Sequence, residues 1–500
     1  MVPAMELRRL PRAPAALRRG AVLVPAPLRD AAQGPALLGW LGVGLAVRLL
    51  LMPLAVSSDL LAFAWRAHLI AYDGEVFGAY LVNMGAHYTQ ALFLRLTDFL
   101  LPAPDVVWSD PWWWAEASAL APQVLRDFAV APYAPATLFA LKLPYLLADL
   151  GTGAALLALC RRCPPAAVRR AFAFWMLSPI GLYASYMFSR YEAFPVVLVV
   201  LALLLAERAR PWTAALLLGL AITMRGYPLL LVPLFGLVVV RGPLRQIAWA
   251  GLAVLPFALV MGSNRLLAGT VGELSRLRDY DTGSTFFAYT LPVDARGEVA
   301  LFFLFAFVVY GVLAGRAWGW WGAGPVPVGE LWLWLLVFHG GMFALATFSA
   351  HYFMWFTPFV ALALGRRAAW RGILWLHLGQ VAVALAVADL LGGPGTLLGL
   401  FLPVAPELVG ALPNLREAFL GSSGPGQLGD QVLTLLRTAF LALTLLLVWP
   451  ALVELWRGAS TPLAGAAPPP RASQAPKEQQ RGAEQQGGPS KREQRLAQQR

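Results

Sequence analysis

The sequence predicts an all-α, polytopic membrane protein with about twelve transmembrane helices and a long first outer loop of membrane-adjacent helices. Of the 500 residues, 59% are hydrophobic and only 13% are charged, and the mean hydropathy is +0.63. A soluble core could not bury so much apolar surface, whereas apolar runs of membrane-spanning length can face lipid. The composition therefore excludes a soluble enzyme, a nucleic-acid-binding module and a disordered scaffold.

Apolar segments follow one another along residues 36–457, which we take as one transmembrane domain. Several have only about 13 to 15 residues and cover about 20 Å as helices, less than the hydrocarbon core. The short pairs around Arg190 and Arg225 must therefore tilt, or meet in a thinned or water-filled cavity, which is a candidate site. The predicted segments are 36–56, 137–160, 172–189, 192–206, 212–224, 227–240, 246–267, 299–314, 330–348, 352–365, 371–391 and 432–456.

The basic residues predict the orientation. Residues 1–35 carry six Arg against two acids, and residues 457–500 carry eight Lys or Arg against three, which accounts for most of the net charge of +12. Because further arginines fall in alternate connecting loops, the positive-inside rule predicts cytoplasmic N- and C-termini. We expect membrane lipids as partners and no nucleic acid, since no aromatic or glycine pattern accompanies the charge. The Gln-, Pro- and Arg-rich tail 458–500 is predicted to be disordered and cytoplasmic.

The opposite face carries the distinctive polar residues. It holds the first outer loop, 57–131, with eight Asp or Glu against three Arg, and the loops near 268–298 and 392–431. The sequence therefore predicts a multi-pass protein of the cell membrane whose functional site faces outwards.

Ionisable groups at membrane depth cost roughly 2 to 4 kcal/mol on insertion scales, so each one is a candidate functional residue. Asp59 follows the first apolar segment directly and precedes an apolar stretch. A carboxylate there is placed to accept a proton at the water interface. An Asp before an apolar run is equally typical of a helix N-cap, and the residues alone leave both interpretations open.

Lys142 is the single Lys outside the C-terminal tail, in a chain that otherwise uses Arg for its cations. It stands seven residues before Asp149, so both side chains lie on one face of a helix. A structural pairing role inside the bundle is the first interpretation, and contact with a ligand phosphate is the second.

Two polar hinges interrupt the short apolar segments in the same way. One contains Arg190 and Glu192, and the other contains Arg225 and Tyr227. The planar guanidinium can hold two phosphate oxygens, so both arginines are candidates to bind an anionic headgroup. The alternative is that each Arg extends from a hairpin to the membrane surface.

A third outer break contains His351 and Tyr352, with Trp355 in the next turn. The imidazole of His351 can donate to a phosphate or a sugar hydroxyl, and the two aromatic rings offer stacking faces. Anchoring in the aromatic belt at the membrane interface explains Tyr and Trp equally well.

The two cysteines, Cys160 and Cys163, predict neither a disulfide framework nor a metal centre. A structural zinc needs four ligands and the chain has no second cysteine pair. We therefore interpret them as free thiols on the cytoplasmic side and assign no metal ligand.

The order of these motifs resembles a known superfamily. An outward Asp after the first span, a long first outer loop, "LKLPYLLADL", "LSPIGLYASYMFSRYEAFP", "MRGYPLLLVPLF" and "HYFMWFTPF" follow one another over roughly residues 36–365. The chain is similar in this respect to the GT-C superfamily of polytopic glycosyltransferases. Within it, the motifs look most like the polyprenyl-phosphate-mannose-dependent alpha-mannosyltransferases.

This resemblance implies an inverting glycosyltransferase that uses a lipid-phosphate-linked hexose, in this family mannose, on the outer face. The acceptor would be a glycolipid, a glycan or a protein of the cell envelope, and Asp59 would be the catalytic base. For such a reaction, the residues singled out above are the candidates for donor or substrate contact: Arg190, Glu192, Arg225, Tyr227, His351, Tyr352 and Lys142. No cofactor is expected, and a divalent metal is not required in principle because the polyprenyl phosphate leaves as a stabilised anion.

The chain also departs from the family pattern. Many relatives have a Gly-Gln-Asp-like hinge where this chain has Ser189 to Glu192, and often a Lys in place of Arg225. The Tyr-Pro-Pro of the first loop is replaced by residues 83–88, Asn-Met-Gly-Ala-His-Tyr. These differences bear on the donor headgroup and on the acceptor.

Two functions from other classes compete with glycosyl transfer. Twelve spans with both termini inside are the common layout of secondary transporters, although the chain shows no symmetric halves. A ligase or polymerase of surface polysaccharide, using lipid diphosphate donors, is the second alternative.

Overall fold

The structure is a computed structural model, and it describes residues 34–77, 83–101, 108, 128–268, 286–287, 289–293, 297–320, 324–347, 349–392 and 427–457. The basic N-terminal residues 1–33 and the tail 458–500 lie outside the described residues, as do most of the loops predicted near 268–298 and 392–431. By their contacts, the described residues all belong to one unit, Met1–Ala464.

The described chain is nearly all helical, as the sequence predicts, and each of the twelve predicted apolar segments has a helical counterpart. Its elements, in chain order, are α2 (Gly34–Leu54), α3 (Ser58–Ala71), α4 (Met84–Leu96), η2 (Asp98–Leu100), α8 (Ala134–Leu159), α9 (Pro165–Leu177), α10 (Pro179–Leu182), η4 (Tyr183–Met187), α11 (Ala193–Glu207), α12 (Pro211–Met224), η5 (Tyr227–Leu231), α13 (Val232–Val239), α14 (Pro243–Ala268), β1 (Thr290–Pro292), β2 (Glu298–Ala300), α17 (Leu301–Trp318), η6 (Val328–Glu330), α18 (Leu331–Leu345), η7 (Ala350–Trp355), α19 (Thr357–Arg366), α20 (Trp370–Gly392) and α24 (Gln427–Arg457).

Seven helices of the described residues are long and apolar enough to cross a membrane. They are Gly34–Leu54, Ala134–Leu159, Pro243–Leu267, Leu301–Trp318, Val328–Leu345, Trp370–Leu390 and Gly429–Leu455. The other five predicted segments are shorter or interrupted, because polar hinges or prolines end their helices early. The described residues thus contain seven helices of membrane-spanning length, and the predicted number of about twelve transmembrane helices is not confirmed.

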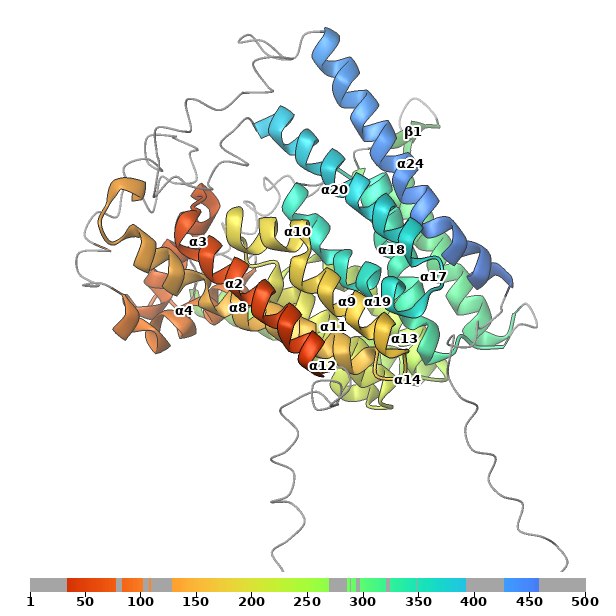
Figure 1. Cartoon of the computed structure of the whole chain (residues 1–500). Coiled ribbons are helices and arrows are strands. Elements are labelled where there is room, and N and C mark those ends of the chain that lie inside the picture. The colour runs from red at the N-terminus through yellow and green to blue at the C-terminus, as the bar shows by residue number, and fades with distance from the viewer. Residues whose placement is uncertain are drawn as a thin grey trace, which may run out of the picture. The chain divides into compact units, whose positions relative to one another are not determined.

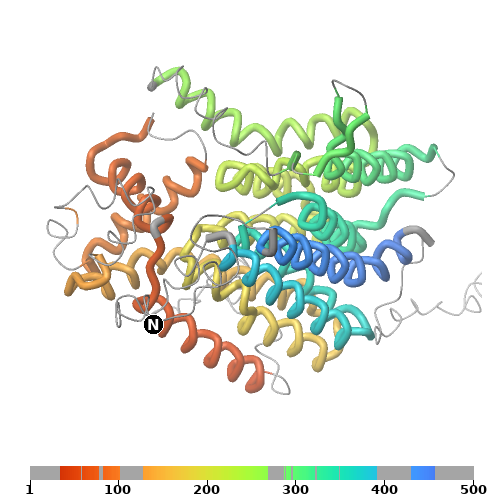
Figure 2. The backbone as a smooth tube through the Cα atoms, turned by 90° about the horizontal axis from the view of Figure 1, so that it is seen from above, coloured from red at the N-terminus to blue at the C-terminus, as the bar shows by residue number. Residues whose placement is uncertain are grey.

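The helices pack side by side, some with their neighbours in the chain and some with helices further along it (Figures 1 and 2). α2 packs on α8 and α9, α11 on α8 and α12, and α20 on α24. Within the predicted first loop, α3 packs on α4, and α4 in turn packs on α8 and α12. This part of the loop is helical, as the sequence predicts, and the structure shows in addition that it packs on the bundle.

A small antiparallel hairpin departs from the all-α prediction. β1 pairs with β2 so that Leu291 faces Val299, and α17 begins directly after β2. With three residues in each strand, the hairpin is a loop feature and does not alter the helical architecture.

A buried ion pair joins α2 to α8. Arg48 is 1% exposed, and its Nε donates to Asp149 Oδ2 at 2.6 Å. The hydroxyl of Tyr186, in η4, donates to the same oxygen at 2.8 Å. Arg48 Nη1 also donates to the carbonyl of Met176 in α9. Asp149 therefore has the structural pairing role inside the bundle that the sequence suggested, but its partner is Arg48 and not Lys142.

Candidate functional site

Asp59 lies in the first turn of α3, where the chain leaves α2. The N-cap of α3 is Ser57, whose Oγ accepts a hydrogen bond from Leu60 N at 3.1 Å. The alternative interpretation of Asp59 as the helix N-cap is therefore wrong, and its carboxylate is available for other contacts. The Ser57 hydroxyl also donates to the carbonyl of Phe188, which ties the start of α3 to the hinge that carries Arg190.

The hinge before Arg190 has an unusual backbone. η4 is a π-helical turn, a form that is rare and often marks functional sites. Ser189 follows with φ of 61°, in the left-handed region that a non-glycine residue seldom adopts, and its hydroxyl donates to Tyr186 O at 3.1 Å. These two features stop the helix and direct Arg190 towards α3. Arg190 Nη1 lies 2.8 Å from Asp59 Oδ2.

The second hinge brings Arg225 to the same place. Arg225 Nη1 donates to the Tyr191 hydroxyl at 2.6 Å. The guanidinium carbons of Arg190 and Arg225 lie 5.4 and 5.5 Å from the centre of the Tyr191 ring. Two arginines from hinges that are 35 residues apart therefore surround one aromatic ring beside Asp59.

Glu192 and the aromatic residues hold Arg225 from the other side. Glu192 is fully buried, accepts a hydrogen bond from Trp355 Nε1 at 2.6 Å, and lies 3.8 Å from Arg225 Nε. The Arg225 guanidinium lies 4.5 Å from the centre of the Tyr352 ring. Trp355 stacks between Tyr352 and Tyr227, with ring centres 4.8 and 3.8 Å apart. This arrangement fixes the position of Arg225 through charge and stacking.

His351 lies in the same cluster and stacks on Phe188, with ring centres 4.5 Å apart. Its Nε2 atom is buried and has no hydrogen-bond partner among the residues that the structure describes, and the same holds for Arg190 Nε. Buried polar groups of this kind are costly without a partner. The cluster therefore holds unused hydrogen-bonding capacity next to two cations.

A neighbouring histidine adds no charge to this cluster. His87, in α4, lies beside Phe63, whose ring stacks on Tyr191. Burial, together with the nearby cations Arg66 and Arg190, lowers the pKa of His87 to about 3. His87 is therefore neutral at physiological pH.

Lys142 lies apart from the cluster, although the sequence groups it with the ligand-binding residues. Its side chain is fully buried, and its Nζ donates to the carbonyls of Met52, Ala55 and Tyr186 at 2.5 to 2.9 Å. An ammonium group has three donors and suits three converging carbonyls, which explains a Lys at this position. Lys142 thus ties the end of α2 to η4. These two segments lead directly into the ones that carry Asp59 and Arg190.

The structure separates the candidate acids by exposure and position. The Asp59 side chain is 37% exposed. The Glu192 side chain is buried, and its carboxylate contacts Trp355 and Arg225. Asp73 follows the far end of α3, roughly 20 Å along the helix from Asp59, beside His68. Asp59 is thus the one of these three acids that combines access with a place next to the arginines.

Tyr191 and Trp355 belong to this site but were not among the residues that the sequence assigned to binding. Both stand inside the recognised motifs, next to Arg190 and three residues after Tyr352. The sequence left Trp355 open between a stacking face and an anchor in the aromatic belt, and nothing in the spacing shows that it donates to Glu192. An aromatic residue adjoining a candidate cation at a hinge was the available signal.

The described residues contain no group of three or more His, Cys, Asp or Glu side chains that could hold a metal ion. Comparisons of the chain with protein-family models, with curated proteins and with solved structures find no match.

Proposed function

We propose that this chain is an integral membrane glycosyltransferase of the GT-C type that transfers a mannosyl group from a polyprenyl-phosphate donor to an acceptor in the cell envelope. The observation that carries the proposal is the contact of a partly exposed carboxylate, Asp59, with Arg190, beside a second arginine, Arg225. Acid–base chemistry on a hydroxyl and stabilisation of a departing phosphate need such neighbours. The acceptor remains one of three classes, a glycolipid, a glycan or a protein.

In the proposed reaction, Asp59 accepts the proton of the acceptor hydroxyl as its oxygen attacks the anomeric carbon. The bond from that carbon to the donor phosphate breaks, and its electron pair leaves with the phosphate oxygen. Arg190, Arg225 and His351 stabilise the developing phosphate charge. Because attack occurs on the face opposite to the leaving group, configuration inverts, and a beta-linked donor gives an alpha-linked product.

Short helices around the cluster support a lipid-linked donor. α11 and α12 have 15 and 14 residues and extend about 22 Å, less than a hydrocarbon core of about 30 Å. With the α11–α12 turn at the headgroup level of the inner face, the other ends of these helices, which carry the cluster, would lie below the headgroups of the outer face. The phosphate of a membrane-anchored donor can reach this depth while its chain stays in the lipid.

The direct test is to incubate the purified protein with polyprenyl-phosphate-mannose and an extract of the source membrane, and to analyse the products by mass spectrometry. We expect an acceptor whose mass rises by one hexose, and release of polyprenyl phosphate. Intact donor after prolonged incubation, with a positive control transferase active in the same extract, contradicts the proposal.

Arg225→Gln is expected to raise the KM for the donor about tenfold with a smaller change in kcat, because hydrogen bonds to charged groups contribute about 1.5–3 kcal/mol. Initial rates at varied donor concentration measure both constants. Arg245→Gln is the matched control, since Arg245 is exposed and lies in the first turn of α14, a different element. Equal donor KM values for the two variants contradict a role for Arg225 in donor binding.

The proposed orientation predicts that the first loop is outside and the Cys160–Cys163 turn is inside. In a variant with both cysteines replaced by Ala, a single Cys at Glu75 is expected to react with a membrane-impermeant maleimide in intact cells. In the wild type, Cys163 is expected to react only after the cells are permeabilised. Labelling of these positions in the reverse pattern contradicts an outward active site.

A further inference from the structure

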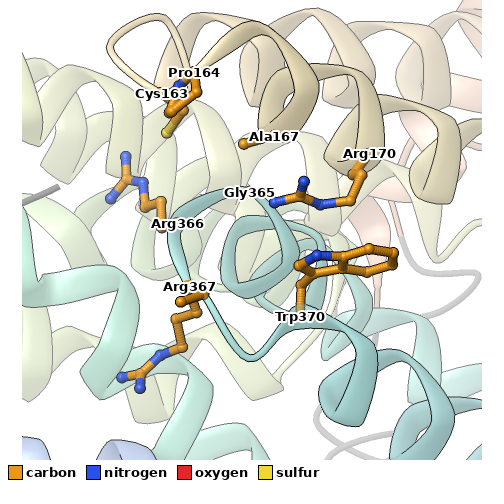
Figure 3. Close-up of a pocket in the computed structure, with 9 residues that line it drawn as sticks. Cys163, Pro164, Ala167, Arg170, Gly365, Arg366, Arg367 and Trp370 are labelled. Carbon is orange, nitrogen blue, oxygen red and sulfur yellow. The ribbon is translucent and has the colours of Figure 1, made fainter. Parts of the chain in front are cut away.

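A basic pocket lies at the opposite end of the bundle from Asp59. α19 begins two residues after Trp355 and ends at Arg366, about 15 Å further along its axis. There a pocket of about 210 Å³ opens between the α8–α9 turn, α9 and the α19–α20 turn. It is lined by Cys163, Pro164, Ala167, Arg170, Gly365, Arg366, Arg367, Ala368 and Trp370 (Figure 3).

The lining of the pocket is positively charged, with three arginines and no acidic residue. Arg366 is paired with Glu207 at 3.1 Å, and Arg367 with Glu454 at 2.6 Å. Arg170 has no carboxylate partner within the described part of the chain, and its guanidinium lies 4.7 Å from the centre of the Trp370 ring. The pocket therefore keeps one uncompensated cation.

The arginines also have unused donors. The Nε atoms of Arg170, Arg366 and Arg367 are buried and have no hydrogen-bond partner among the described residues. The Arg366 side chain is 8% exposed, so it is a fixed part of the wall. Figure 3 shows the Arg170 side chain extending over the Trp370 indole towards Gly365, with Cys163 and Arg366 on the other side of the pocket. Guanidinium groups in this arrangement suit the oxygens of a phosphate.

The position of the pocket indicates the source of that phosphate. It is bounded by the end of α8 at Leu159, the end of α19 at Arg366 and the start of α20 at Trp370. Ends of apolar helices lie at the level of the headgroups, and basic pockets between helices at this level bind anionic lipids. Trp370 is amphipathic and suits the same interface.

We propose that this pocket binds the phosphate group of an anionic phospholipid headgroup, with Arg170 as its main cationic contact. The site is separate from the Asp59 cluster and does not depend on the proposed glycosyl transfer. Bound lipid would add a contact between the α8–α9 turn and the α19–α20 turn, beside the hydrogen bond that Arg366 Nη2 donates to Leu159 O at 2.8 Å.

Cys163 provides a native probe of occupancy. Its hydrogen bond with Cys160 and the neighbouring Arg366 lower the pKa of Cys163 below its ordinary value, which raises the fraction of reactive thiolate. Cys160 is buried and Cys163 is partly exposed at the pocket wall. Alkylation of the wild-type protein by a small neutral reagent therefore reports on the pocket when it is located by peptide mass spectrometry.

The experiment compares the rate of Cys163 alkylation by iodoacetamide in nanodiscs of phosphatidylcholine alone and in nanodiscs that also contain phosphatidylglycerol. We expect phosphatidylglycerol to slow the reaction severalfold in the wild type. Arg170→Gln is expected to abolish this protection. Arg208→Gln, an exposed arginine at the α11–α12 turn, is expected to retain it and so controls for the surface potential of the membrane.

A further arm adds inorganic phosphate to the phosphatidylcholine nanodiscs at constant ionic strength. Protection by inorganic phosphate without protection by phosphatidylglycerol would assign the pocket to a soluble anion and overturn the lipid proposal. Equal rates in both nanodiscs, or equal loss of protection in Arg170→Gln and Arg208→Gln, would also overturn it. The comparison of wild-type rates needs no variant, so the proposal stays testable if Arg170→Gln does not fold.

Discussion

Asp59→Asn is expected to reduce the turnover of glycosyl transfer by about two or more orders of magnitude while the protein still folds and binds the donor. Asn keeps the size of the side chain, and its amide oxygen can still accept a hydrogen bond from Arg190. It cannot take the proton of an acceptor hydroxyl, whose pKa lies far above neutrality. Single-turnover rates with saturating donor measure the loss, and donor binding is measured separately.

Asp73→Asn is the matched control, because Asp73 is an acid near the other end of the same helix and contacts neither arginine in the described structure. Its turnover is expected to stay near that of the wild type. Near-normal turnover of Asp59→Asn would falsify the assignment of Asp59 as the base. Glu192 would then be the next acid to test, although its carboxylate is buried against Trp355.

Arg48→Met is expected to lower the free energy of unfolding by about 3–5 kcal/mol, because it leaves the Asp149 carboxylate in the bundle without its cation. The Tyr186 hydroxyl would remain as a donor to Asp149 but cannot neutralise it. The midpoint of thermal unfolding in detergent is expected to fall accordingly. Arg162→Met, at an exposed position, is expected to leave the midpoint almost unchanged.

A second substitution separates charge from packing at this position. In the Arg48→Met background, Asp149→Asn removes the unpaired charge and keeps an acceptor for Tyr186. We expect the double variant to regain most of the lost stability. If the double variant is as unstable as Arg48→Met alone, the loss comes from packing of the Arg48 side chain and the ion pair contributes little.

The positions of the helices could be predicted from the sequence because apolar runs and arginine-rich turns record the contact of each segment with lipid or water. The same reasoning identified the hinges at Arg190 and Arg225, since a charged residue between two short apolar segments has a local signature. The number of long helices was not predictable, because hydropathy does not show that the apolar segment 172–189 is divided where α9 ends at Leu177, before Pro179.

Pairings between distant segments could not be predicted. Asp149 stands seven residues from Lys142 and 101 residues from Arg48, yet it pairs with Arg48. Lys142 binds three backbone carbonyls, and such acceptors leave no mark in the sequence. The contacts of Glu192 with Trp355 and of Arg225 with Tyr191 depend likewise on how the hinges converge in space.

The ion pair of Arg48 and Asp149 also has a consequence for biogenesis. α2 leaves the ribosome with a charged residue in its interior, which on insertion scales costs about 2.5–3.5 kcal/mol at a helix centre. Asp149 is synthesised 101 residues later, which at 5–20 residues per second is a delay of roughly 5–20 s. During this interval the first helix contains an arginine without its carboxylate. The cost of the unpaired charge in α2 is therefore offset only when α8 packs beside it and supplies Asp149.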